Sequence, residues 1–423
     1  MMKKTIIFLL MLMVLMPVSA YDFKSGDLYY NITSPMEPFT VEVTYQEYPS
    51  VKNYEGVTAV NIPETVIYND TTYQVTSIGI SAFYTCSSLT EVNIPNSVAN
   101  ISDSAFYQCV ALKSASLPEG IMSIAPQTFY ECASLTSMTL PNSVILIGES
   151  AFCGCTSLEN ISLGQSVADI GENAFRKCIA LKEIAFPNSL ICVGKTAFYG
   201  CSLLESITLP PYVEILGEKI FEGCTSLSSI VVDEENPVFD SREQCNAVIS
   251  TYDNTLLFGC QKSTIPSTIT TIAKNAFSGC SAITEIIIPN SVTRIEEYAF
   301  SLCSSLDTVF IGSGVTFIGD RAFSGCSSLK KVTCEAKQLP QIGYYIFWFV
   351  PVANATLYVP ESAYEAYKEA DQWKSFGTIV PYKPTAITHT LMQNSKPQKI
   401  YRDGQILIRS HNRTYNLLGV PTH

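Results

Sequence analysis

The chain has 423 residues, of which 47% are apolar and 15% are charged, and its formal charge at pH 7 is −12. This composition excludes an intrinsically disordered chain, and this length fits either several domains or one long array of repeats. The first twenty residues carry +2 and residues 383–423 carry +5, which leaves −19 for residues 21–382. Nucleic acid is therefore not expected as a partner, because an acidic surface repels phosphate.

Residues 1–20 have the organisation of a secretory signal peptide. Two lysines at positions 3 and 4 precede the apolar stretch 6–18, and residues 18–20 are small enough for signal cleavage. The mature chain is therefore predicted to begin at Tyr21. The alternative, a retained anchor, is disfavoured because the stretch is shorter than a spanning helix. No integral span is expected after cleavage, since the apolar segment 342–350 is shorter still.

Residues 21–56 are interpreted as an N-terminal β cap that precedes a repeat. Phe39, Val41, Val43 and Tyr45 alternate with polar residues, which predicts a strand with one buried face. Repeat arrays need such caps, because an open end exposes both the core and a strand edge.

A 23-residue period dominates residues 57–334. Each period places a phenylalanine 23 residues after the last, and a cysteine follows it by three positions. The phenylalanines are Phe83, Phe106, Phe129, Phe152, Phe175, Phe198 and Phe221, then Phe277, Phe300 and Phe323. Each period also carries an L-x-x-L-x-L pattern, such as Leu158, Ile161 and Leu163, which predicts a short strand. The A-F-x-x-C segment is predicted to turn the chain back as a helical or 3₁₀ turn.

Stacking of these copies predicts a solenoid with parallel strands roughly 4.8 Å apart and an internal column of phenylalanines. The ten repeat cysteines share one environment, so we interpret them as small buried free thiols, with disulfides as the alternative for an exported chain. A glycine often precedes A-F, but Ser102, Ala125 and Glu296 replace it elsewhere. That position is therefore assigned to packing and not to a phosphate-binding loop.

Residues 233–265 interrupt the period, because the step from Phe221 to Phe277 is 56 residues. Insertions in solenoids often project from one face and bind ligands, although this one could equally be a decorated rung. Cys245 and Cys260 lie inside it and are the best candidates for a disulfide.

The C-terminal end contains two further segments. Residues 335–382 are predicted to form a C-terminal cap with a last strand at 356–359, a helix ending near Ala370, and Trp373 over the end of the core. In residues 383–423, Asp403-Gly404 between apolar runs predicts a hairpin. The tail is similar to type IX secretion sorting signals at Ile400, Gly404, Ile406, Ile408, Tyr415, Leu417 and Gly419. A plain β-hairpin tail is the alternative.

Catalytic chemistry has little support in this sequence. The three histidines, His389, His411 and His423, all lie in the tail, which excludes histidine-based catalysis or zinc binding inside the solenoid. No two carboxylates recur at a fixed spacing, and no phosphate-binding glycine motif opens a helix. The chain is therefore predicted to be no enzyme and to use no metal or cofactor.

Two surfaces are candidate ligand sites. Outward strand positions are mostly small and polar, as at Asn93, Ser116 and Thr139, but they become apolar at Val231, Ile287 and Phe310, which predicts a contact patch. Coverage of this patch by the insertion is the alternative. The position after the repeat phenylalanine forms a candidate aromatic stripe at Tyr84, Tyr107, Tyr130 and Tyr199. Such a stripe could bind glycans or proteins, or simply cover the edge of the core.

The pattern SLTEVNIPNSV followed by SAFYQC resembles the BspA-like leucine-rich repeats of bacterial surface and secreted proteins, over roughly residues 57–334. The resemblance implies a right-handed leucine-rich-repeat solenoid, β-rich and capped at both ends. It also implies a non-catalytic binding protein, secreted or at the cell surface. We therefore expect an adhesin for host or community proteins. The alternative is a glycan-binding accessory protein for nutrient capture.

Overall fold

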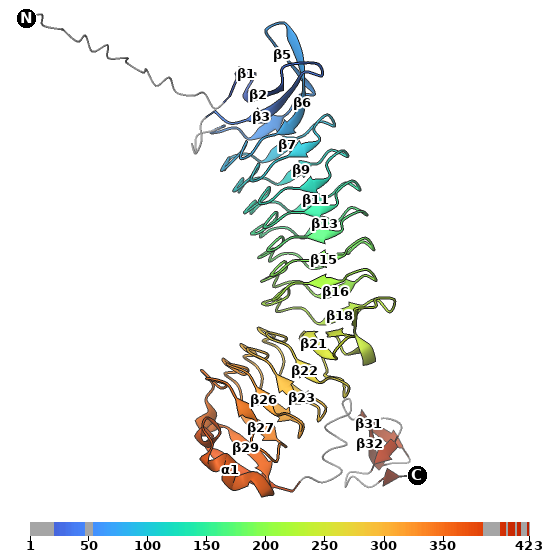
Figure 1. Ribbon diagram of the computed structural model, residues 1–423, viewed down its shortest axis with the longest axis vertical. Coiled ribbons are helices and arrows are strands. Elements are labelled where there is room, and N and C mark those ends of the chain that lie inside the picture. Colours follow the sequence, from blue (N-terminus) through green and yellow to red (C-terminus); the bar gives the residue numbers. More distant parts are fainter. Residues whose placement is uncertain are drawn as a thin grey trace, which may run out of the picture.

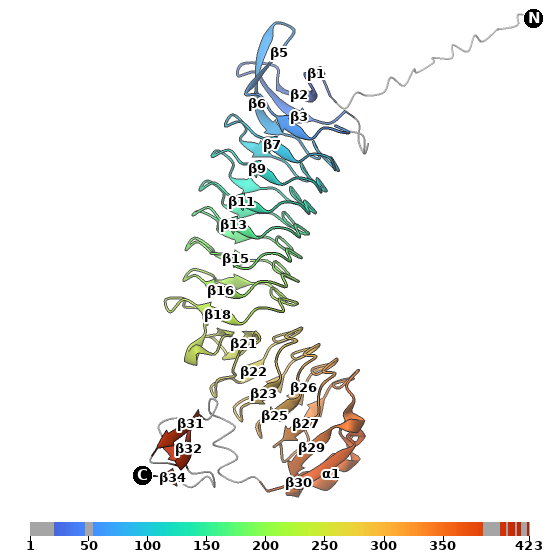
Figure 2. The same ribbon diagram turned by 180° about the vertical axis from the view of Figure 1, so that it is seen from behind.

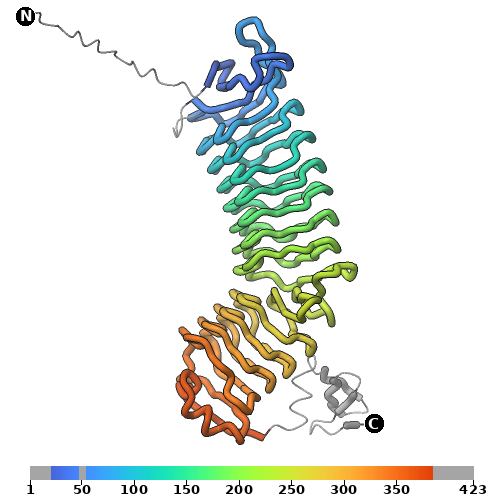
Figure 3. Tube along the Cα trace, viewed as in Figure 1, coloured from blue at the N-terminus to red at the C-terminus, as the bar shows by residue number. Residues whose placement is uncertain are grey.

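The computed structural model describes residues 21–46, residues 54–383 and four short strands within residues 398–422. The predicted signal peptide lies outside this part of the chain. Successive turns of chain stack into an elongated β-solenoid, seen from opposite sides in Figures 1 and 2. The tube in Figure 3 shows two arms that meet at an angle near the insertion. The solenoid predicted from the 23-residue period is confirmed.

The first sheet places β1 (Phe23–Ser25), β2 (Leu28–Ser34), β3 (Thr40–Thr44), β6 (Thr71–Ile78) and β5 (Thr65–Tyr68) in that order. Val41 and Val43 of β3 are fully buried, in keeping with the alternation at positions 39–45. β3 runs parallel to β6, and β6 pairs in turn with β8 (Asn100–Ile101). This sheet therefore continues directly into the hydrogen bonding between rungs.

Most rungs contribute two short strands, and equivalent strands of neighbouring rungs pair in parallel. The first strand row contains β4 (Ala59–Asn61), β7 (Glu91–Asn93), β9 (Ser114–Ser116), β11 (Ser137–Thr139), β13 (Asn160–Ser162), β16 (Ser206–Leu209), β18 (Ser229–Val232), β23 (Glu285–Ile288), β25 (Thr308–Ile311), β27 (Lys331–Cys334), β29 (Thr356–Pro360) and β30 (Thr378–Tyr382). The second strand row contains β8, β10 (Ser123–Ile124), β12 (Leu146–Ile147), β14 (Asp169–Ile170), β15 (Cys192–Val193), β17 (Ile215–Leu216), β22 (Thr271–Ile272), β24 (Arg294–Ile295), β26 (Phe317–Ile318) and β28 (Gln341–Ile342).

The A-F-x-x-C corner is a run of tight turns, so the predicted helical or 3₁₀ turn is wrong there. In the first corner the amides of Ala82, Tyr84 and Cys86 donate to the carbonyls three residues earlier, while Ser81 and Thr85 have φ of 56°. Left-handed residues four apart prevent a helix from continuing. The left-handed residues also turn every second backbone N–H toward the next rung. The Phe83 N–H, for example, donates to the Ala105 carbonyl of that rung.

The glycines that often precede A-F pack against the rung before them. A Cβ atom added at Gly171, Gly194 or Gly217 would lie 2.9 Å or less from backbone atoms of the preceding rung. The assignment of these glycines to packing is therefore supported by close approach of the two backbones, and no positive φ is involved.

The repeat phenylalanines form two continuous stacks. Within the N-terminal arm the ring centroids of Phe83 and Phe106 are 5.2 Å apart, and those of Phe175 and Phe198 are 5.3 Å apart. In the other arm Phe277, Phe300 and Phe323 stack at 5.0 and 5.2 Å, and Phe347 extends the column at 5.8 Å. Phe347 was missed by the period because its step from Phe323 is 24 residues.

The repeat cysteines are buried free thiols that link neighbouring rungs. Eight of the ten donate a hydrogen bond to the carbonyl of the phenylalanine 26 residues earlier, at 3.1–3.2 Å. Burial raises the pKa of the Cys201 and Cys326 thiols to about 12. Cysteine suits the position because it is small, apolar and able to donate one weak hydrogen bond.

The insertion begins a new sheet and divides the core. Its strands β19 (Phe239–Asp240), β20 (Val248–Ser250) and β21 (Thr255–Phe258) pair antiparallel, and β21 then pairs in parallel with β22. The 3₁₀ turn η1 (Arg242–Gln244) lies between β19 and β20. One buried apolar cluster extends from Phe23 to Cys260 and a second from Cys245 to Phe376, so each arm has its own core.

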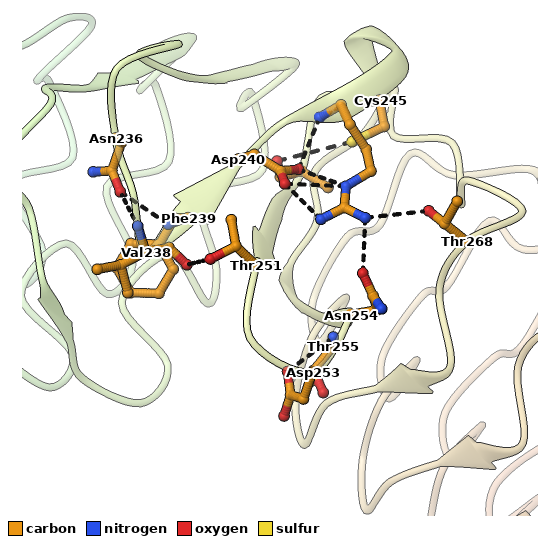
Figure 4. Close-up of polar contacts among 12 residues, drawn as sticks. Asn236, Val238, Phe239, Asp240, Cys245, Thr251, Asp253, Asn254, Thr255 and Thr268 are labelled. Carbon is orange, nitrogen blue, oxygen red and sulfur yellow. Dashed lines mark hydrogen bonds and ion pairs between the residues drawn. The ribbon is translucent and has the colours of Figure 1, made fainter.

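Polar side chains fix the insertion to both arms. The Asn236 amide donates to the carbonyls of Pro210 and Val213 at 3.1 and 3.0 Å, and its oxygen accepts from the amides of Val238 and Phe239. Arg242 forms an ion pair with Asp240, with an N–O distance of 2.6 Å, and donates to Asn254 and Thr268. Figure 4 labels these three partners. A single arginine therefore ties η1 to the first rung of the C-terminal arm.

The disulfide expected between Cys245 and Cys260 is absent, because both residues are buried free thiols. Cys245 packs in the core of the C-terminal arm, whereas Cys260 belongs to the core of the N-terminal arm. The Cys260 thiol donates to the Asn246 carbonyl at 3.3 Å. The two sulfurs therefore face different cores.

The end of the C-terminal arm is closed by η2 (Val352–Asn354), η3 (Glu361–Ala363), α1 (Tyr364–Glu369) and η4 (Trp373–Ser375), packed beside β29 and β30. Trp373 is buried and meets Phe347 edge-on at 5.6 Å, so its predicted position over the end of the core is confirmed. In the tail, β31 (Gln398–Arg402) and β32 (Gln405–Ser410) form the predicted hairpin, followed by β33 (Arg413–Tyr415) and β34 (Pro421–Thr422). Three residues of the proposed sorting signal, Gly404, Leu417 and Gly419, lie outside the described residues.

We predict that Phe175→Ala lowers the free energy of unfolding by about 3–5 kcal/mol, because it removes a ring from the centre of a closed stack. Phe221→Ala should cost less, because Phe221 is slightly exposed and ends its stack at the insertion. Guanidinium denaturation of both variants measures the difference. Equal losses would show that the stack does not act as a continuous core.

We predict that the fold loses stability as pH rises above about 8.5, the ordinary pKa of a cysteine thiol. Burial raises the thiol pKa in the folded state, so between that value and about 12 only the unfolded chain ionises these groups. Urea denaturation from pH 7 to 11 measures this slope. Cys201→Ala should make the fall of the unfolding free energy with pH shallower. An unchanged slope would contradict the interpretation that this thiol stays protonated in the folded state.

Candidate functional site

The outward face of the first strand row is lined by small polar side chains in the N-terminal arm. Asn61, Asn93, Ser116, Thr139 and Ser162 occupy equivalent positions in successive strands, and all five are exposed. The Asn93 amide donates to Asn61 Oδ1 at 2.8 Å, and the Ser116 hydroxyl donates to Asn93 Oδ1 at 3.3 Å. Hydrogen bonding along the row orients these side chains while leaving them accessible.

Four adjoining hollows follow this face, and we call them together the strand groove. Their volumes are about 500, 510, 320 and 570 Å³, and each shares lining residues with the next. Ser116 belongs to the first two hollows, and Ser162 belongs to the last three. The strand groove therefore extends continuously from Asn61 to Asp233.

The strand groove is acidic at its rim. Its lining includes Glu64, Glu119, Glu183 and Asp233, and contains no lysine or arginine. The remaining polar groups are hydroxyls and amides, which can both donate and accept hydrogen bonds. This chemistry fits a neutral or basic ligand and disfavours an anionic one.

The strand row is interrupted within the groove at residues 181–187, which form no strand. Phe186 lies there, half-buried, and its ring meets that of Phe198 edge-on at 5.8 Å. The interruption separates the β11–β13 pair from the β16–β18 pair. Phe186 and Ile184 both line the largest of the four hollows, at about 570 Å³.

The three residues of the predicted apolar patch have different environments. Val231 is 43% exposed in β18, opposite Thr208 of the groove, whereas Ile287 is half-buried and Phe310 is only 4% exposed. Ile287 and Phe310 are neighbours in register, but Val231 belongs to a separate sheet across the insertion. Only Val231 therefore offers a ligand much apolar surface.

Three of the predicted stripe tyrosines stack in one column. Ring centroids of Tyr84 and Tyr107 are 4.8 Å apart, and those of Tyr107 and Tyr130 are 4.6 Å apart. All three are half-buried, and burial raises the pKa of Tyr130 to about 12. Tyr199 lies apart from them and stacks against the Arg176 guanidinium at 4.4 Å.

The described residues contain no group of three or more His, Cys, Asp or Glu side chains that could hold a metal ion. The three histidines lie outside the described part of the chain. Within that part, no helix has the length and apolar character needed to cross a bilayer. What the site offers is an extended surface for hydrogen bonding and contact.

Solved structures with the same architecture come from several bacteria. A leucine-rich cell surface protein of Faecalibacterium prausnitzii aligns with a TM-score of 0.59 and 22% identity over 88% of this chain and 98% of its own. The pneumococcal vaccine antigen PcpA aligns with a TM-score of 0.54 and 19% identity over 86% and 98%. A leucine-rich-repeat protein of Eubacterium ventriosum aligns with a TM-score of 0.52 and 18% identity over 79% of this chain and 87% of its own. At these identities the likeness establishes the fold alone.

A search of curated proteins returned no significant match. The family model for the BspA-type leucine-rich repeat region, which contains six copies of the repeat, matches residues 53–156, 122–243 and 250–370. These ranges cover most of the chain and both of its arms. The repeat family suggests a non-catalytic binding role. This chain belongs to the family of BspA-type leucine-rich-repeat proteins.

Proposed function

We propose that this protein is an exported adhesin that binds a host or bacterial surface protein along the strand groove. The observation that carries the proposal is the row of exposed amides and hydroxyls from Asn61 to Ser162, which lines connected hollows over several rungs. A shallow groove of this length suits an extended protein surface better than it suits a small molecule, which is usually enclosed.

The composition of the groove defines the partner further. Carboxylates at Glu64, Glu119 and Asp233 without a nearby cation in the lining favour a partner segment that is neutral or basic. Phe186 and Val231 provide apolar contacts toward one end. Such a combination gives polar specificity along the strands and one apolar anchor point.

Export is part of the proposal. The charged, apolar and small-residue regions of residues 1–20 support secretion, and the tail after residue 383 supports type IX sorting. The protein would then act outside the cell or at its surface. Glycan capture for nutrient uptake remains the alternative function, and aromatic surfaces would be its physical basis.

The groove is tested with residues 21–383 and the variants Ser116→Arg and Ser162→Arg, on an array of extracellular-matrix and plasma proteins. Both variants place a long cation on an exposed strand position, so the core should be unchanged and binding of any protein hit should weaken at least about tenfold, or 1.4 kcal/mol. Thr293→Arg, at an exposed position of the other arm, is the matched control.

Phe310 is left unchanged in these tests, because it is covered and a carboxylate at its place would be buried without a partner. Saturable protein binding that is lost in both groove variants and retained in Thr293→Arg supports the proposal. Binding that is equal in all three variants contradicts it. Binding of glycans alone would favour the nutrient-capture alternative.

A further inference from the structure

The last regular rung carries exposed aromatic rings far from the strand groove. Tyr344 is 77% exposed, Tyr345 59%, Trp348 43% and Phe349 74%. We call these four residues the aromatic corner, because they lie on the turn side of the rung that follows β28. The Trp348 and Phe349 rings are 4.5 Å apart, and the Tyr345 and Trp348 rings are 5.9 Å apart. The Tyr345, Trp348 and Phe349 rings therefore form one contiguous surface, and Tyr344 is the residue before them in the chain.

The aromatic corner is not needed to close the end of the solenoid. Phe347, in the same rung, points into the core and meets Trp373 and Phe376 edge-on at 5.6 and 5.2 Å. Trp373, Phe376 and Tyr367 are themselves buried. Other aromatic residues therefore cover the end of the core, and the four exposed rings are not required for this.

The backbone makes the exposed rings costly. Tyr345 and Phe349 both have φ of 58°, a left-handed conformation that bulky residues avoid at a cost of about 1 kcal/mol or more. Both positions have positive φ in the other regular rungs as well. The Phe349 position holds glycine in five of them, namely Gly154, Gly200, Gly223, Gly279 and Gly325. The Tyr345 position holds Asn173 and Asn275 but also Tyr298 and Arg321. What distinguishes this rung is that both positions carry exposed aromatic rings, and clustered apolar side chains on a surface are a feature of binding sites.

Arg321 of the preceding rung lies among these rings. Its guanidinium carbon is 4.8 Å from the Trp348 ring and 5.9 Å from the Tyr345 ring, and its Nη1 donates to the Tyr298 hydroxyl at 2.6 Å. No carboxylate pairs with Arg321 within the described chain. Arg321 therefore orients Trp348 through cation–π contact and places hydrogen-bond donors beside the rings.

We propose that the aromatic corner binds a neutral saccharide chain of β-linked pyranoses. The C–H faces of such sugars stack on the electron-rich faces of aromatic rings, and their hydroxyls can accept hydrogen bonds from a neighbouring guanidinium. A neutral chain is not repelled by a protein of charge −12, whereas an acidic polysaccharide would be.

The composition of the corner favours a saccharide over a protein partner. Its exposed apolar surface is almost entirely aromatic, with Leu302 as the neighbouring aliphatic residue, which is 57% exposed. Protein interfaces usually combine aromatic anchors with aliphatic packing and a polar rim. The corner is independent of the strand groove, since it lies on the other arm and uses the turn side of the rungs.

The test uses the tryptophan fluorescence of the full mature chain. The chain has two tryptophans, and because Trp373 is buried, Trp348 is the one that a ligand can contact. Titration with cellohexaose and with chitohexaose should give a saturable change in emission for at least one of them. Tyr345→Asn/Phe349→Gly should weaken this binding at least about tenfold.

The double variant is chosen to preserve the fold, because asparagine and glycine already occupy these backbone positions in Asn275 and Gly325. Its melting temperature should equal or exceed that of the parent. Tyr84→Ser, in the tyrosine column of the other arm, is the control and should bind the sugar normally, as should Ser116→Arg in the strand groove. No saturable change with either hexasaccharide overturns the proposal. So does equal affinity in the double variant.

Discussion

Parallel stacking of rungs places each side chain about 4.8 Å from its own counterpart in the next rung, and this spacing governs the whole structure. A column can be occupied only by a residue type that is compatible with a copy of itself. Phenylalanine meets the requirement by stacking, asparagine by donating to another asparagine, and cysteine by donating to a carbonyl of the neighbouring rung. Buried charge does not meet it, because like charges would repel along the column.

The insertion keeps backbone hydrogen bonds to the neighbouring turns of the chain, but it interrupts the column of identical side chains in the core. β21 takes the position of a rung strand and pairs with β22, in a sheet separate from those of the N-terminal arm. A backbone hydrogen bond from the Gln261 N–H to the Leu227 carbonyl still joins the insertion to the last rung of the N-terminal arm. The phenylalanine column does not continue, since Phe221 meets Phe258 edge-on instead of stacking on Phe277. Each arm therefore presents a separate surface, with polar groups on the strands of one arm and aromatic rings on the turns of the other.

Periodicity predicted the architecture because the Phe and Cys spacings report directly on a repeated environment. It failed where local geometry departs from the period. The left-handed residues at Ser81 and Thr85 carry no distinctive side chain, so the tight turns were predicted as a helical turn. The period does not predict Phe347, because one extra residue precedes it, and the aromatic corner beside it is recognisable in the sequence only as a short apolar segment. The burial of Phe310 and the separation of Cys245 from Cys260 depend on contacts between distant segments, which spacing alone does not contain.

The orientation of the hydrogen bonds between rungs determines how this molecule responds to force. The strands lie across the long axis (Figure 1), so the bonds that join them point along it. A load applied between the two ends breaks the hydrogen bonds of one pair of neighbouring rungs after another. Each rung that yields releases 23 residues of slack, roughly 75–80 Å of extended chain. A solenoid built in this way should lengthen in equal steps under load and absorb work while its remaining rungs stay folded.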